Sequence, residues 1–158
     1  MNARTTPDTC NPAVSVITAT LLFPIRNRIT GVSANDGQWH QICATWENAN
    51  GEWKLYKDGK MERTGTGLKT GHVIRAEGSL VLGQEQDSTG GNFDQSQSFQ
   101  GSLTNVNVWS YVLPASTIEE LSGCCRAGEG NVYRWYDFIY AIKGNTRLVI
   151  PPTCKCVY

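Results

Sequence analysis

Residues 80–101 read LVLGQEQDSTGGNFDQSQSFQG, and the rest of the chain is organised around this stretch. Its start belongs to the short apolar run Ser79–Leu82, which predicts a buried strand. A polar loop follows, with the glycine pair Gly90–Gly91 near its centre. Both halves of this loop carry oxygen-donor side chains, namely Glu85, Gln86, Asp87, Asp94 and Gln97.

These oxygen donors suit a hard divalent cation. Calcium takes about six to eight oxygen ligands, from carboxylates, amides, backbone carbonyls and water. The glycine pair lets the backbone fold back, so that the two halves of the loop face one ion. No basic residue lies between Gly83 and Gly101 to neutralise the carboxylates. The pattern predicts Ca²⁺ bound by the five residues named above, although polar, glycine-rich loops also serve as solvated connections.

Composition narrows the fold and the partners. The 158 residues are enough for one domain with a real core. Fourteen basic and fourteen acidic residues balance, which argues against nucleic acid and anionic membranes as partners. Short runs of β-branched and aromatic residues between scattered Gly and Pro favour an all-β sandwich. The apolar run 13–25 is too short to span a bilayer, and we interpret it as one or two buried strands rather than a secretory signal.

Six cysteines favour an oxidising compartment. Cys124–Cys125 and the Cys154/Cys156 pair lack the spacing of about two to four residues that is typical of zinc ligands. Zinc is therefore the weaker interpretation. The pairing of the cysteines does not follow from the sequence.

Periodicity and turn residues predict the remaining elements. The sequence Lys57-Asp58-Gly59-Lys60 is typical of a type I′ hairpin turn, because Asp-Gly accepts positive φ angles. Pro114 fits the first position of a helix. Residues 1–12 are interpreted as a polar tail or loop. The predicted strands are Trp39–Trp46, Glu52–Lys57, Met61–Thr66, Ser102–Trp109, Gly130–Phe138 and Leu148–Ile150, and the predicted helix is Ala115–Leu121.

Four motifs resemble one known family. They are DGQWHQICATW (36–46), KDGK (57–60), LGQEQDSTGGNFDQSQSFQGSLTNVNVW (82–109) and GNVYRWYDF (130–138). In this order they resemble the pentraxins, and the resemblance covers residues 28–154. It implies an antiparallel jelly-roll β-sandwich of the concanavalin/laminin-G type with one short helix.

The resemblance also implies a function. It indicates a secreted, calcium-dependent, lectin-like module that binds phosphocholine-like or anionic carbohydrate ligands and is able to form homo-oligomers. It implies a Cys125–Cys154 disulfide. Cys43 resembles one half of the family's intradomain disulfide, and its partner here is either Cys10 or none.

The resemblance thins toward the N-terminus. We assign residues 21–158 to a pentraxin-like domain and leave 1–20 unassigned as a tail or a degenerate N-terminal part. An Asp-Asn pair that completes the family's calcium site has no clear counterpart upstream, so the domain looks N-terminally incomplete. The alternative is a laminin-G-like structural or adhesion module with a degenerate metal site.

Catalysis has little support in the sequence. His40 has no visible triad partners and is interpreted as structural. Glu85 and Asp87 share the spacing of paired carboxylates in some glycosidases, but the third acidic position of that pattern is Gly90 here. We expect a binding protein and no enzyme.

Overall fold

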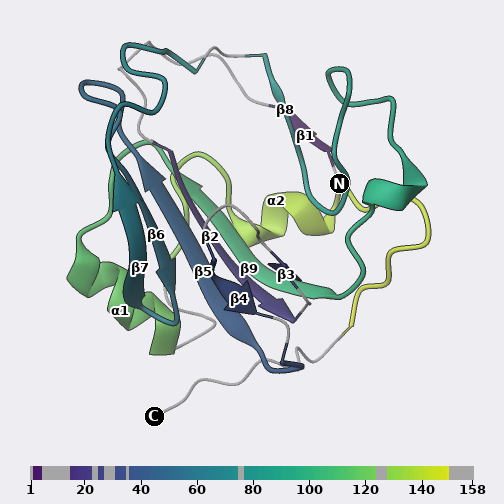
Figure 1. The fold of residues 1–158 in the computed structure, drawn as a ribbon. Coiled ribbons are helices and arrows are strands. Elements are labelled where there is room, and N and C mark those ends of the chain that lie inside the picture. The colour runs from purple at the N-terminus through teal and green to yellow at the C-terminus, as the bar shows by residue number, and fades with distance from the viewer. Residues whose placement is uncertain are drawn as a thin grey trace.

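The computed structural model shows a molecule built mainly from antiparallel strands, with two short helices in the part that it describes (Figure 1). Secondary structure alone is described for 2–4, 15–22 and 25–26. Side chains are described as well for 31–34, 36–74, 77–123 and 128–149.

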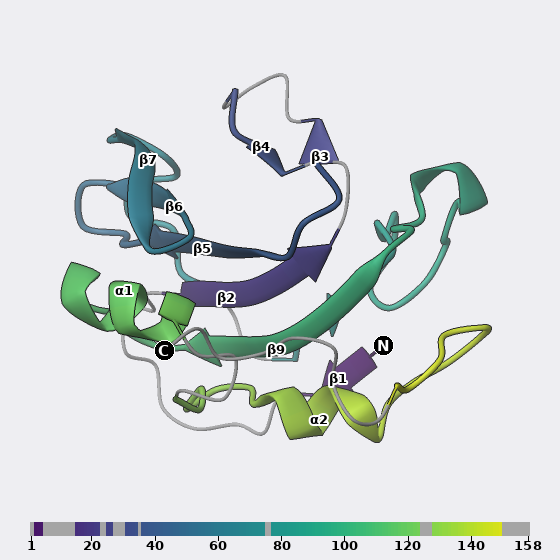
Figure 2. The same cartoon turned by 90° about the horizontal axis from the view of Figure 1, so that it is seen from below.

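A five-stranded antiparallel sheet forms the body of the molecule, in the order β7-β6-β5-β2-β9. Seen from below, this sheet is strongly curved, and β6 and β7 rise at one end of it (Figure 2). Its strands are β2 (Ser15–Leu22), β5 (His40–Trp46), β6 (Trp53–Lys57), β7 (Lys60–Gly65) and β9 (Ser102–Trp109). Two small two-stranded sheets stand beside it, one made of β1 (Asn2–Arg4) and β8 (Ser79–Val81), the other of β3 (Ile25–Arg26) and β4 (Ser33–Ala34).

The predicted strands and hairpin of the large sheet are confirmed. On β5 the side chains alternate, since Cys43 and Thr45 are buried while Ala44 between them is exposed. The β6–β7 turn has Asp58 at φ +50° and Gly59 at φ +77°, which is the positive pair that a type I′ turn requires. Within the run 13–25, Ser15–Leu22 forms β2 and Ile25 begins β3, as predicted, and β2 crosses the boundary that the sequence suggested between residues 20 and 21.

Two clusters of buried side chains form the core. The helix α1 (Ala115–Gly123) contributes Ile118 and Leu121 to the first cluster, where they pack with Cys43 and Tyr56 of the sheet. This confirms the predicted helix. The second cluster joins Val106 and Val108 of β9 to Tyr133 and to Phe138 of α2 (Trp135–Ile139); its partly buried members are Leu80, Leu82 and Trp135.

Three predictions about the ends of the chain are wrong. Asn2–Arg4 is not tail but strand β1, which pairs antiparallel with β8. Residues 130–138 do not form a strand, because Tyr133 makes only a single bridge to Val108 and the helix α2 begins at Trp135. Leu148 and Val149 lie outside any strand, and Ile150 is outside the described residues.

The apolar run Ser79–Leu82 is a strand as predicted, but it is only partly buried. The reason is its position: β8 pairs with β1 in a small sheet and not with the large one. The helix α2 lies against both β9 and β1, and Figure 1 shows β1 and β8 standing apart from the five-stranded sheet. Leu80 and Leu82 are partly buried and pack against the second core cluster.

The turn from β5 to β6 is held by one carboxylate. Glu47 accepts hydrogen bonds from the backbone N–H groups of Asn50 (3.2 Å), Glu52 (3.4 Å) and Ala49 (3.1 Å). The Asn50 donor has the largest effect, and together these donors lower the pKa of Glu47 below its ordinary value of 4.5, against a smaller opposing effect of burial. Folding therefore favours the ionised form of Glu47.

We expect this turn to lose stability in acid. Because the folded pKa of Glu47 is lowered, its contribution is fully present above the unfolded pKa near 4.5 and is lost as the pH falls through the folded value. Urea unfolding of wild type and Glu47→Gln measures this at pH 6.5 and pH 3.5. The wild type should be the more stable protein at pH 6.5, and the difference in free energy of unfolding between the two proteins should be smaller at pH 3.5. An equal difference at both pH values would contradict the prediction.

Candidate functional site

The oxygen-rich loop begins directly after β8 and is closed by backbone hydrogen bonds. Phe99 donates its N–H to the carbonyl of Gly83 (2.9 Å), which brings the two ends of the loop together. Inside it, Gly91 donates to the carbonyl of Ser88 (3.0 Å) across a tight turn, where Gly90 has φ +69°. The predicted reversal of the chain at Gly90–Gly91 is therefore present.

The side chain of Gln86 connects two parts of the loop to strand β8. Its Nε2 donates to the carbonyl of Ser79 on β8 (2.8 Å), and its Oε1 accepts from the N–H of Gly90 (2.8 Å). Both ends of the side-chain amide are thus used to tie the loop to the strand. What Gln86 retains for a cation is its backbone carbonyl.

The second half of the loop forms a short 3₁₀ helix that the sequence analysis did not anticipate. Asp94 caps this helix, η1 (Gln95–Gln97), because its Oδ1 accepts from both N (2.8 Å) and Oγ (2.8 Å) of Ser96. These bonds, the backbone one first, lower the pKa of Asp94. Its Oδ2 has no hydrogen-bond partner among the described residues, and Gln97 is exposed at the end of η1.

Glu85 and Asp87 are the two loop carboxylates that the described part of the protein leaves unused. Both are exposed, and neither has a hydrogen bond or an ion pair with another described residue. Across the described ranges, no three His, Cys, Asp or Glu side chains come close enough together to hold a metal ion. Glu85, Asp87 and Asp94 therefore do not form such a group here, and their role as ligands stays a prediction.

The chemistry of the loop nevertheless fits a hard cation. Every unused donor is an oxygen, which is the ligand type that calcium prefers. Gln84, the residue before Glu85, adds one more: its Oε1 is buried and has no hydrogen-bond partner. A buried acceptor without a partner is costly, and a cation or an ordered water would satisfy it. The residues present thus fit calcium by donor type.

A hollow of about 470 Å³ opens beside the first half of the loop. It lies between the start of β8 and the tight turn, and it is open to solvent. Its walls are polar and come from Gly78, Ser79, Gln86, Asp87, Ser88 and Thr89. Asp87 belongs both to this wall and to the predicted ligands, so the hollow adjoins the predicted metal position.

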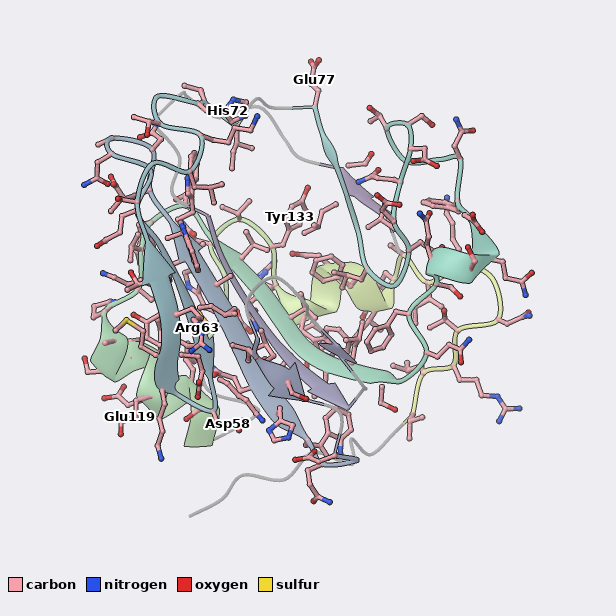
Figure 3. The ribbon with its side chains drawn as sticks, in the orientation of Figure 1. Asp58, Arg63, His72, Glu77, Glu119 and Tyr133 are labelled. Carbon is pink, nitrogen blue, oxygen red and sulfur yellow. The ribbon has the colours of Figure 1, made fainter. Side chains whose placement is uncertain are left out.

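His40 has two carboxylate partners that sequence reasoning missed. Its Nδ1 lies 2.7 Å from Oδ2 of Asp58, and its Nε2 lies 2.9 Å from Oδ1 of Asp36. Asp58 sits at the end of the molecule opposite β8 (Figure 3). Because both ring nitrogens contact carboxylates, neither is left to activate a hydroxyl or thiol nucleophile. The structural interpretation of His40 therefore holds.

The predicted disulfides fall largely outside the described residues. Cys10, Cys125 and Cys154 are not described, so the Cys125–Cys154 and Cys10–Cys43 pairings stay predictions. Cys43 itself is fully buried in the first core cluster. Among the helices of the described ranges, none has the length and apolar character that crossing a membrane requires.

The antiparallel sheets and the oxygen-rich loop after β8 define the chain as an all-β domain. Comparison with known proteins makes the assignment specific: the Pentaxin family model matches residues 18–151, and the chain belongs to this family. The family match begins within β2, upstream of the motifs that carried the resemblance.

Individual relatives support the same family assignment. The chain is 42% identical over 118 residues to "Sushi, von Willebrand factor type A, EGF and pentraxin domain-containing protein 1" of Rattus norvegicus, covering 73% of the chain and 3% of that protein. It is 43% identical over 121 residues to neuronal pentraxin-2 of Homo sapiens, covering 77% of the chain and 28% of that protein. The chain thus spans a small part of these relatives' length.

A solved structure shows the same fold. The heptameric SAP-like pentraxin of Limulus polyphemus superposes with a TM-score of 0.65 at 23% sequence identity, covering 85% of this chain and 88% of the other. At this identity the likeness establishes the architecture and no more.

Proposed function

We propose that this chain is a calcium-dependent ligand-binding module of an extracellular protein. Its ligands to calcium would be the side chains of Glu85, Asp87, Asp94 and Gln97 and the backbone carbonyl of Gln86. The observation that carries the proposal is that Glu85 and Asp87 have no partner among the described residues, on a loop that Gln86 ties to β8. Glu85 and Asp87 place two negative charges on one short loop, and a bound divalent ion would offset the repulsion between them.

The bound calcium would supply open coordination positions for ligand oxygens, from a phosphate monoester of the phosphocholine type or from a carbohydrate. The chain's own residues supply the frame. Gln86 holds the first half of the loop against β8, and the Asp94 cap holds the second half as η1. The free Oδ2 of Asp94 is the oxygen that this cap leaves for the ion.

The setting that we propose is extracellular. Six cysteines in 158 residues suit an oxidising compartment, where a Cys125–Cys154 disulfide would close the domain of residues 21–158. Assembly into homo-oligomers is part of the same proposal. In this proposal the protein binds its ligand and does not catalyse a reaction on it.

A second candidate is a laminin-G-like structural or adhesion module that binds no metal. One observation favours it: the carboxylates of the loop do not gather into a metal-binding group within the described ranges. Under this alternative Glu85 and Asp87 are ordinary solvated side chains on a surface connection.

Calcium titration separates the two candidates. Isothermal calorimetry of the EDTA-treated, dialysed chain should show saturable binding of calcium. Calcium at about 100 times its Kd should raise the free energy of unfolding by about 2.7 kcal/mol, because only the folded state binds the ion. Magnesium serves as the control, since it requires a tighter octahedral site. Absence of both heat and thermal stabilisation in millimolar calcium overturns the proposal and leaves the structural module.

A further inference from the structure

His40, at the start of β5, lies between two carboxylates from different parts of the chain. Its Nδ1 is 2.7 Å from Oδ2 of Asp58 in the β6–β7 turn, and its Nε2 is 2.9 Å from Oδ1 of Asp36 in the loop before β5. Only 11% of the His40 side chain is exposed, so the ring is largely shielded from water. The proposed calcium binding does not use these three side chains.

Both contacts are satisfied only when the ring carries two protons. A neutral imidazole has one N–H donor and one acceptor nitrogen, whereas an ionised carboxylate only accepts. The pKa of Asp36 is lowered, first by the N–H of Gln38 and second by the bond to His40, so this carboxylate is ionised at neutral pH. A neutral ring would therefore place two acceptors against each other in one of the two contacts. The doubly protonated ring donates to both carboxylates, and each bond then joins opposite charges.

The carboxylate of Asp58 is fixed by further bonds. Its Oδ1 accepts the N–H of Gln41 (3.0 Å), and its own N–H donates to the Gln41 carbonyl (2.9 Å). The side chain of Gln41 accepts from the N–H of Gly59 (3.3 Å) and donates to the carbonyl of Ile118 on α1 (3.4 Å). The turn that carries Asp58 is thus tied to β5 and, through Gln41, to α1.

The loop 36–38 is held more weakly than this turn. Its three residues are exposed, and a Cβ at Gly37 would meet no atom of the described residues within 4 Å. Within the loop, the N–H of Gln38 donates to Asp36 (3.0 Å). Among the described residues, the contact of Asp36 with His40 is the one side-chain bond that ties this loop to the sheet.

No other charged group of the described residues contacts the His40 ring. On β6, Lys57 donates its Nζ to a backbone carbonyl of β4 (2.7 Å). Lys60 on β7 and Glu119 on α1 are exposed. On the other side of β5, strand β2 pairs the uncharged residue Leu21 with His40. The protonation of the ring is therefore read by the two Asp carboxylates.

We propose that Asp36, His40 and Asp58 form a pH-sensitive clasp. While the ring carries two protons, the clasp holds the loop 36–38 against β5 and the β6–β7 turn. When the ring loses one proton, the other stays on Nδ1, toward the firmly held Asp58. The bare Nε2 then repels the Asp36 carboxylate, and the loop is released. Histidine is the side chain whose charge normally changes between about pH 5 and pH 8, so this release accompanies a rise in pH.

NMR of the full chain labelled with ¹⁵N tests the clasp, in a titration from about pH 5 to about pH 9. The ring-nitrogen signals of His40 should show protons on both nitrogens at the acidic end and on Nδ1 alone at the alkaline end. The backbone amide signals of Gly37 and Gln38 should shift with the same midpoint as the ring, because the loop is released when the ring becomes neutral.

Two variants separate the clasp from a general effect of charge. In Asp36→Asn, the amide is able to accept from a protonated Nε2 and to donate to a bare one, so the loop signals should no longer follow the ring. Glu119→Gln removes a negative charge at the same end of the molecule (Figure 3), and its loop signals should titrate as in wild type. Loop amides that stay in place while the ring titrates, or that shift equally in wild type and Asp36→Asn, overturn the inference. A ring that never carries two protons in this range overturns it as well.

Discussion

Replacing Gly130 with alanine is expected to lower the free energy of unfolding by about 3 kcal/mol or more, a large part of the roughly 5 to 15 kcal/mol that is typical of a folded domain. Gly130 is buried where the segment before α2 crosses β9. A Cβ atom added there would lie 2.6 Å from the backbone nitrogen of Val108 and would also clash with the carbonyl oxygen of Tyr133.

Neither of these backbone atoms is free to move. Val108 donates its N–H to the carbonyl of Tyr133 at 2.9 Å, and its own carbonyl accepts from Val132 at 3.0 Å, so shifting either segment breaks this β-bridge. Gly130 itself donates to Oδ1 of Asn107, which is buried. The added methyl group would therefore cost packing and hydrogen bonds together.

Urea unfolding followed by tryptophan fluorescence measures the loss. Gly78→Ala is the matched control, because a Cβ at Gly78 meets no atom of the described residues within 4 Å. Its free energy of unfolding should stay within about 0.5 kcal/mol of wild type. A Gly130→Ala protein as stable as Gly78→Ala would show that the approach of the two backbones is looser than described.

Replacing Asp87 with asparagine is expected to weaken calcium binding by about 100-fold or more. The substitution keeps the size of the side chain and removes its charge, and charged oxygen ligands set much of the affinity of calcium sites. Asp87 is exposed and has no hydrogen bond to a described residue, so the fold does not depend on it. Calorimetric titration with calcium gives the two dissociation constants directly.

The control for charge is Glu119→Gln. Glu119 is exposed on α1, at the end of the molecule opposite β8 (Figure 3). This variant loses one negative charge far from the loop and should bind calcium as wild type does. Equal calcium affinity in wild type and Asp87→Asn would remove Asp87 from the site, while an equal loss in both variants would point to a general charge effect.

Local rules predicted much of the sheet correctly. The Asp58-Gly59 turn follows from backbone sterics, and β5, β6 and α1 follow from side-chain periodicity and a well-placed proline. Each of these features is decided within a few residues. Two of the motifs that carried the family resemblance, 36–46 and 57–60, lie in these local elements.

The errors have a local cause in one segment and a distant cause in another. Residues 130–138 have aromatic and β-branched side chains that favour a strand, yet Asp137 accepts the N–H of Arg134 (2.7 Å) and the chain turns into α2. Ser102–Trp109 forms a strand as predicted, but a register shift opposite β2 gives Asn105 a φ of +53° and both Asn105 and Asn107 are buried. Both Asn residues are satisfied by bonds between them and to Gly130.

For the candidate site, the sequence by itself determined which oxygen donors are present and that the loop holds no basic residue to neutralise them. Only the tertiary structure decided how each donor is used. The Gln86 side chain donates to a backbone carbonyl of β8, and one oxygen of Asp94 accepts from a backbone N–H of η1, because these backbone groups lie within hydrogen-bonding reach.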